Sequence, residues 1–423
     1  MRKLVVAVAC SLSMQLHAGK FPDVNYSPPT DWHQSVFELS QSYPDAPTES
    51  PRYAWTSIDF RTKPERYGWA VLDYCFEGNT NVDFVVQRNA IRQWYHAPWL
   101  HEGQNAREFV HGLTGERNSR PYELWATQTA SYKNVAVGFY NEPGGIVIGK
   151  VWKDPDNPDT SIVSFPDGTV SCKLLFTTAS VSVVPYLSGS PEWVADLDRS
   201  PDSNQIMANK VRLLQIDIAV KDSRSSKGGW IFGTFHYDAA VASPDPWRRL
   251  KLLTLMWGDD PTLTPSRMAS GGVPVESWIN PSSPIVIYRN NPPAGISAPK
   301  TLGWAGRGNG PVDSPTSSCL SCHGTAQTPR MNVGMTAPPN LPESDKLRWF
   351  RNLTAGESFS QGASTLDFSL QLGVGLENWQ NAKVLIPVQP SVNPKEFSKM
   401  RKVPISQGVK VFSRDPNEPT EDK

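Results

Sequence analysis

The chain has 423 residues, and its 41 Lys and Arg balance 41 Asp and Glu, so the formal net charge is zero. That length is too great for one compact core and favours two or three domains, while a 39% apolar content with fifteen Trp argues against wholesale disorder. The charge balance gives no electrostatic case for nucleic acid binding, and the 38 Pro and 30 Gly favour a loop-rich, mainly β architecture.

Residues 1–18 are typical of a signal peptide. A basic start precedes an apolar run from Leu4 to Leu16, and Leu16-His17-Ala18 has the small-residue pattern of a cleavage site. The run is shorter than the roughly 20 residues needed to span a bilayer, and no later apolar segment reaches that length. We therefore expect a periplasmic or otherwise exported protein without a transmembrane segment; a lipoprotein anchored through Cys10 is the minor alternative.

Residues 19–52 are rich in Pro and polar residues and predict an irregular N-terminal arm. Residues 53–290 predict a β-rich domain, because β-branched and aromatic runs alternate with Gly and Pro turns. An antiparallel β-sandwich-like fold is the simplest interpretation. The expected strands are 67–76, 135–140, 145–152, 170–176, 211–220 and 230–237.

Residues 281–318 are dominated by Pro, Gly, Ser and Asn and predict a linker or long connection. It leads into a second unit, assigned to residues 291–400, in which a helix is expected at 344–353. Residues 366–379 alternate as a strand would, yet a helix is also possible there. The charged tail, 401–423, is expected to fray.

The chemistry of the second unit is carried by Cys319-Leu-Ser-Cys322-His323. In a Cys-x-x-Cys-His motif each thiol can add to one vinyl group of haem, and the adjacent imidazole can bind the iron. The alternatives are a structural disulfide, a dithiol redox pair and half of a zinc site. No second Cys pair is present for zinc, and no βαβ context supports a thioredoxin-like pair.

On this motif the second unit resembles the c-type cytochromes; the N-terminal β-rich domain resembles no family that we identify. The resemblance implies one covalent haem c, with Cys319 and Cys322 as the thioether cysteines and His323 as the proximal iron ligand. It also implies a small, loop-rich, partly α-helical cytochrome c-like domain, which favours a helix at 366–379. The residues before Cys319 depart from the family pattern, because Gly310-Pro-Val-Asp-Ser-Pro-Thr-Ser-Ser is no amphipathic helix.

The sixth iron ligand is less defined. Met335 or Met331 lies in a loop that could return over the haem, and a thioether would raise the reduction potential. A His from another domain, or an open position, is the alternative. His96, His101 and His111 cluster with aromatic residues ahead of Arg117, but their spacing matches no standard metal motif, so packed histidines or a polar binding face are favoured.

Cys75 and Cys172 lie in expected strands of the β-rich domain, and an oxidising compartment makes a disulfide between them as reasonable as two buried thiols.

These observations favour an exported monohaem cytochrome that transfers electrons to or from a redox partner protein and is more an electron carrier than an enzyme. One alternative is a haem enzyme or sensor with an open sixth position, peroxidase-like. Another is a carbohydrate- or protein-binding β-domain with an accessory haem, which a row of exposed aromatics on one sheet face would support.

Overall fold

The computed structural model describes residues 21, 28–48, 52–100, 107–197, 208–291, 293–294 and 302–385. The expected signal peptide with Cys10, the tail 401–423 and His101 lie outside the described residues. Within 28–48 the chain forms neither helix nor strand, in agreement with an irregular arm.

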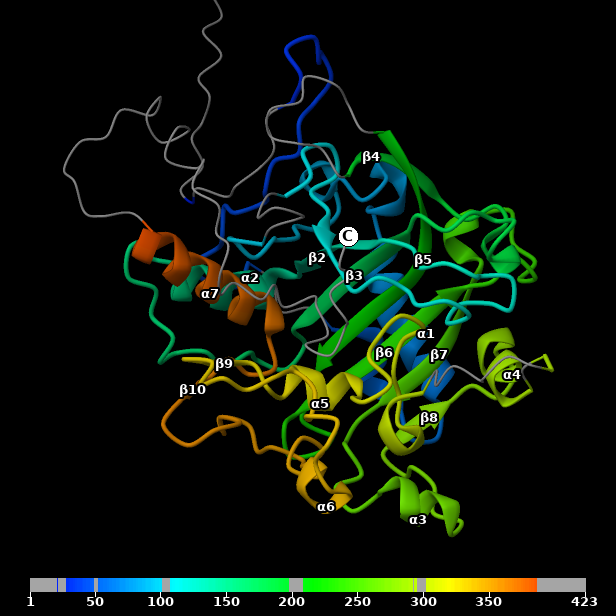
Figure 1. Cartoon of the computed structure of the whole chain (residues 1–423). Coiled ribbons are helices and arrows are strands. Elements are labelled where there is room, and N and C mark those ends of the chain that lie inside the picture. The colour runs from blue at the N-terminus through cyan, green and yellow to red at the C-terminus, as the bar shows by residue number, and fades with distance from the viewer. Residues whose placement is uncertain are drawn as a thin grey trace, which may run out of the picture.

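The centre of the molecule is an eight-stranded antiparallel sheet (Figure 1). Its order is β1-β2-β3-β5-β6-β7-β8, and β4 pairs with the free part of the long strand β5. A mainly β region is therefore confirmed, and so are four of the expected strands. The strands span β1 (Thr114–Gly115), β2 (Asn134–Tyr140), β3 (Val170–Thr177), β4 (Glu192–Asp196), β5 (Ala208–Lys221), β6 (Trp230–Tyr237), β7 (Leu250–Met256) and β8 (Ser277–Ile279).

One face of the sheet packs on helix α1 (Pro64–Phe76), which contacts β5 and β7 and lies behind the sheet in Figure 1. The expectation of a strand at 67–76 is wrong. Pro64 occupies the first turn, where a missing N–H costs nothing, and Tyr67, Val71 and Cys75 recur every fourth residue as a buried helical stripe.

The expectation of a strand at 145–152 is also wrong, because those residues belong to α2 (Glu142–Val151). Pro143 again starts the helix, and Ile148, Val151 and Trp152 are buried in the second apolar cluster of the molecule. In α1 the buried positions recur every three to four residues rather than every two, whereas in α2 residues 144–148 are all buried and show no such period.

A disulfide joins Cys75 of α1 to Cys172 of β3, with a Cα–Cα separation of 6.6 Å. Of the two alternatives left by the sequence, the bonded one is therefore found. The bond fastens the helix to the middle of the sheet, because Cys172 faces α1 while its neighbour Lys173 points to the opposite face.

The opposite face of the sheet is covered by residues 302–385, yellow to orange in Figure 1. The expected sandwich of two sheets is therefore not found: among the described residues the covering layer contains only a two-stranded ribbon beside helices and loops. Its elements are α5 (Cys319–His323), β9 (Gln327–Thr328), α6 (Glu343–Lys346), β10 (Ser364–Thr365) and α7 (Leu370–Leu385).

Within this layer the helix expected at 344–353 is only the short α6, whereas the helix favoured at 366–379 is α7. Helix α7 runs beside α2, where Trp379 meets Trp152 edge to face. Its first turn lies so close to the sheet that a Cβ on Gly138 would sit 2.6 Å from the Gln371 amide nitrogen, which explains a glycine in mid-strand.

Most of residues 303–318 is buried against the sheet, so this part of the expected linker is a packed connection instead.

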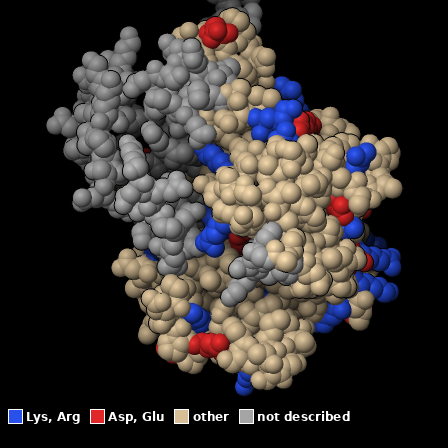
Figure 2. Space-filling view, turned by 45° about the vertical axis from the view of Figure 1, so that its right-hand side comes forward, with Lys and Arg blue, Asp and Glu red and all other residues tan. Residues whose placement is uncertain are grey.

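Two short helices, α3 (Pro265–Ala269) and α4 (Pro284–Asn290), lie at the edge near β8. No described helix is both long and apolar enough to cross a membrane. Basic and acidic side chains are interspersed on the face shown in Figure 2, as the equal totals lead one to expect.

Candidate functional site: a cavity between the sheet and the Cys-x-x-Cys-His helix

A cavity of about 1000 Å³ separates the sheet from the layer that covers it. Its floor is the face of β2, β3, β5 and β6, and its other walls are α5, the loop 330–339 and the start of α7. All five residues that the sequence singled out for haem binding line this one cavity: Cys319, Cys322, His323, Met331 and Met335.

Helix α5 consists of the motif itself, and Ser318 caps it. The Ser318 hydroxyl accepts from the backbone N–H of Ser321 at 2.9 Å, and the Ser321 hydroxyl accepts from the backbone N–H of Ser318 at 2.7 Å. This reciprocal pair satisfies two donors that a helix N-terminus otherwise leaves unpaired. A Ser before the first cysteine and another between the two cysteines therefore start the motif as a helix.

The cap is in turn held by a carboxyl group from the loop after β7. Ser318 donates from its hydroxyl to Asp259 Oδ1 at 2.5 Å. Burial raises the pKa of Asp259 to about 7. The guanidinium of Arg307 is buried beside it and donates to the backbone carbonyls of Asp259 and Asp260 at 2.7 Å each.

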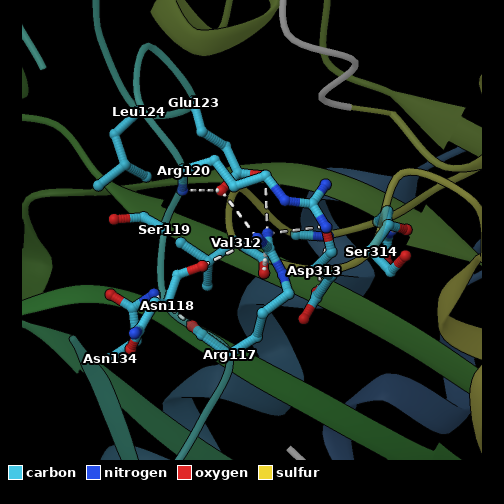
Figure 3. Close-up of polar contacts among 12 residues, drawn as sticks. Arg117, Asn118, Ser119, Arg120, Glu123, Leu124, Asn134, Val312, Asp313 and Ser314 are labelled. Carbon is cyan, nitrogen blue, oxygen red and sulfur yellow. Dashed lines mark hydrogen bonds and ion pairs between the residues drawn. The ribbon is translucent and has the colours of Figure 1, made fainter. Parts of the chain in front are cut away.

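The segment that enters the motif is held from its other side by Arg117, as Figure 3 shows. This buried guanidinium pairs with both oxygens of Glu123, at 2.7 and 3.0 Å, and also donates to the backbone carbonyls of Val312 and Asp313. A bidentate ion pair thus fixes the guanidinium that holds the segment leading into the motif.

The thiols of Cys319 and Cys322 are not bonded to each other. Burial, together with the nearby carboxylate of Asp313, raises the pKa of Cys322 to about 12 and that of Cys319 well above its usual range. Both side chains therefore remain protonated thiols at neutral pH.

His323 presents one ring nitrogen to the cavity. Its Nδ1 lies 2.9 Å from the backbone carbonyl oxygen of Phe368, an acceptor, so Nδ1 carries the proton and Nε2 has a free lone pair. Burial lowers the pKa of His323 to about 4, which keeps the ring neutral. Its ring centre lies 4.4 Å from that of Phe232 in β6. A neutral imidazole fixed through Nδ1 is the usual arrangement of a metal ligand.

The sheet wall of the cavity carries a polar row across three strands. Lys173, Asp217 and Thr234 are direct cross-strand partners on β3, β5 and β6. Lys173 pairs with Glu116 at 2.9 Å, and Asp217 accepts from the Thr234 hydroxyl at 2.8 Å. Burial and the nearby charge of Asp313 raise the pKa of Asp217 to about 6. Ionisable groups in an otherwise apolar sheet face are typical of functional cavities.

The two candidate sixth ligands both lie in the loop that forms the cavity's outer wall. Met331 is 49% exposed and adopts a positive φ of 55°, whereas Met335 is partly buried. Met335 is therefore the better placed of the two to remain inside the cavity.

Neither His96 nor His111 lines this cavity. His96 is buried and its Nδ1 accepts from the backbone N–H of Ser40 at 3.0 Å, while the His111 ring stacks on Trp193. Among the described residues no group of three or more His, Cys, Asp or Glu side chains could hold a metal ion.

Sequence reasoning missed the polar row and the groups that hold the motif from outside. Nothing in the sequence distinguished Asp217 or Asp259 from the other acidic residues of the chain. No known protein family, curated protein or solved structure matched the chain.

Proposed function

We propose that the chain is an exported monohaem c-type cytochrome, in which Cys319 and Cys322 bind the haem covalently and His323 is the proximal iron ligand. One observation carries the proposal: the two thiols and an imidazole with a free Nε2 face the same large cavity. A zinc site, a disulfide or a dithiol redox pair would need neither that volume nor that orientation.

The cavity suits a porphyrin in size and in chemistry. Its volume lies at the upper end of the roughly 300–1,000 Å³ that is usual for cofactor sites. Its walls include the aromatic side chains of Trp230, Phe232 and Phe368, which suit a flat macrocycle, while Lys173 and Arg330 can face carboxylate substituents.

A haem bound there supplies a one-electron couple between ferric and ferrous iron. The protein's part is to attach and hold it. Each thiol adds across one vinyl double bond, so that a carbon–sulfur bond forms, the thiol hydrogen passes to the neighbouring carbon, and no oxidant is consumed. His323 donates its Nε2 lone pair while Phe368 holds the opposite side of the ring.

The proposal predicts one haem per chain in protein produced with the cytochrome c maturation machinery. A pyridine haemochrome assay should give a c-type spectrum, and acidified acetone should leave the pigment on the protein. C319A/C322A should lose covalent haem. C75A/C172A is the matched control, because it removes two cysteines outside the motif and should keep the pigment. Colourless wild-type protein, or pigment extracted by acetone, would end the proposal.

A second candidate is a haem enzyme with an open sixth position, and the ionisable row of Lys173 and Asp217 on the cavity wall favours it. The absorption spectrum separates the two candidates. A low-spin spectrum that M335A, but not M331A, converts to high spin supports electron transfer with a Met335 ligand. A high-spin wild-type spectrum that responds to cyanide supports the enzyme.

Every Trp of the chain is described and none is exposed, which gives no support to an aromatic carbohydrate-binding face.

A further inference from the structure

Phe368, whose carbonyl holds His323, sits in an unusual piece of backbone. Asp367 and Phe368, just before α7, adopt positive φ angles of 46° and 66°. Residues other than glycine hold this left-handed conformation only where surrounding contacts impose it. Something must therefore fix the pair in place, and the side chain of Asp367 is the group that does so.

Asp367 is 3% exposed, and both of its oxygens are occupied by donors from the sheet side of the molecule. Oδ1 accepts from Lys221 Nζ at 2.7 Å and from Trp230 Nε1 at 2.9 Å, and Oδ2 accepts from the backbone N–H of Phe165 at 2.7 Å. Lys221 and Trp230 are cross-strand partners at the end of the β5–β6 hairpin. Two sheet residues and the backbone of Phe165 thus hold Asp367 in place. Asp367 directly precedes Phe368, whose carbonyl orients His323.

We propose that Asp367 is a positioning residue for the iron ligand: through its bonds to Lys221, Trp230 and Phe165 it aims the Phe368 carbonyl at His323, and so lets the β-sheet set the haem reduction potential. This inference rests on the proposed covalent haem. Asp367 does not line the cavity and would not contact the iron. It acts on His323 through the backbone carbonyl of Phe368.

The expected direction follows from the hydrogen bond. A carbonyl that accepts firmly from Nδ1–H makes the imidazole a more basic ligand, and a more basic ligand favours ferric over ferrous iron. Loosening the Phe368 carbonyl should therefore raise the potential. It should also free the imidazole plane to rotate about the iron–nitrogen axis.

The test compares D367N, K221M and the double variant D367N/K221M, with potentials from spectroelectrochemical titration at pH 7. Charge alone predicts opposite effects, since D367N removes a negative charge and K221M a positive one, and it predicts little change in the double variant. Positioning predicts that all three raise the potential. We expect at least a tenfold shift of the ferric–ferrous equilibrium, which for one electron is about 59 mV.

D238N is the matched control. Asp238 is a buried carboxylate paired with Lys251 at 2.8 Å, and neither residue lines the cavity. The haem reduction potential of D238N should therefore match that of the wild type. The haem-methyl proton shifts of the ferric protein give a second readout, because they follow the orientation of the axial imidazole. They should move in the double variant and not in D238N.

Outcomes for this inference and for the haem proposal are separable. Pyridine haemochrome assays on every variant report whether haem is attached. Wild-type protein without covalent haem overturns the proposed function. Haem-loaded protein whose potential rises in D367N, falls in K221M and is unchanged in the double variant overturns the positioning role and leaves the cytochrome standing. The double variant also covers the case in which a single variant fails to fold, since it leaves no unpaired buried charge.

Discussion

The carboxyl group of Asp259 makes the stability of the structure around helix α5 depend on pH. It is 3% exposed, and burial raises its pKa from 3.8 to about 7. A carboxyl with a raised native pKa binds its proton more tightly in the folded than in the unfolded chain. Its contribution to stability is therefore present at low pH and is lost as the pH rises from about 4 to about 7.

D259N removes this titration and keeps an acceptor for the Ser318 hydroxyl. The free energy of unfolding of the wild type, relative to D259N, should therefore fall by roughly 2–4 kcal/mol between pH 4 and pH 7. Urea unfolding of both proteins at several pH values measures the difference, in which the other titrating groups cancel. A difference that is flat with pH, or that grows with pH, would show that the Asp259 pKa is not raised in the folded protein.

At the scale of single residues, the sequence identified only site residues that lie close together along the chain. Cys319, Cys322 and His323 could be identified because their spacing is itself the chemical signal. Asp259 lies 59 residues from its partner Ser318, and Asp367 lies 146 and 137 residues from Lys221 and Trp230. No composition or periodicity connects positions that only the fold brings together, so these groups could not be predicted.

The secondary structure elements show where patterns compete. Strands β2, β3, β5 and β6 were predicted because they are buried runs of β-branched and aromatic residues between turns. Helices α1 and α2 contain the same residue types and were mistaken for strands. In both, a proline at the helix start was the available signal. In α1, burial at a three- to four-residue spacing was a second signal, whereas residues 144–148 of α2 are all buried and gave none.

The disulfide between α1 and β3 carries the prediction for this scale. It closes a loop of 97 residues, so its loss should increase the entropy of the unfolded chain considerably. C75A/C172A should lower the free energy of unfolding by about 2–4 kcal/mol, and its denaturant m value should rise because the unfolded chain expands. Urea unfolding followed by circular dichroism measures both.

Wild-type protein unfolded in the presence of a reductant provides the control, because it should approach the variant in both quantities. The haem content of the variant should be unchanged, which separates this structural bond from the motif cysteines. An unaltered midpoint and m value in the variant would mean that the bond contributes nothing to stability.

At the scale of the whole molecule, the covering layer of residues 302–385 and the sheet share one apolar cluster. Trp230 and Phe232 from β6 pack in the same cluster as Leu320 of α5 and Phe350 and Leu366 from the covering layer. The hydrogen bond from Arg117 to the Val312 carbonyl and the buried ion pair between Lys221 and Asp367 cross the same boundary. The apolar residues of the covering layer therefore share their core with those of the sheet.

This shared core predicts that the sheet and the covering layer unfold together. The thioether bonds would keep haem on the unfolded chain, so a change in the Soret band reports loss of the His323 ligand rather than loss of haem. Soret absorbance, far-ultraviolet circular dichroism and Trp fluorescence should therefore give coincident urea transitions with one midpoint. R117M, which removes the guanidinium that pairs with Glu123 and donates to the Val312 carbonyl, should move all three curves to lower urea by the same amount, equivalent to about 3–5 kcal/mol. If the Soret transition instead occurred at lower urea than the other two, and R117M shifted only the Soret curve, the covering layer would be an independent domain docked on the sheet.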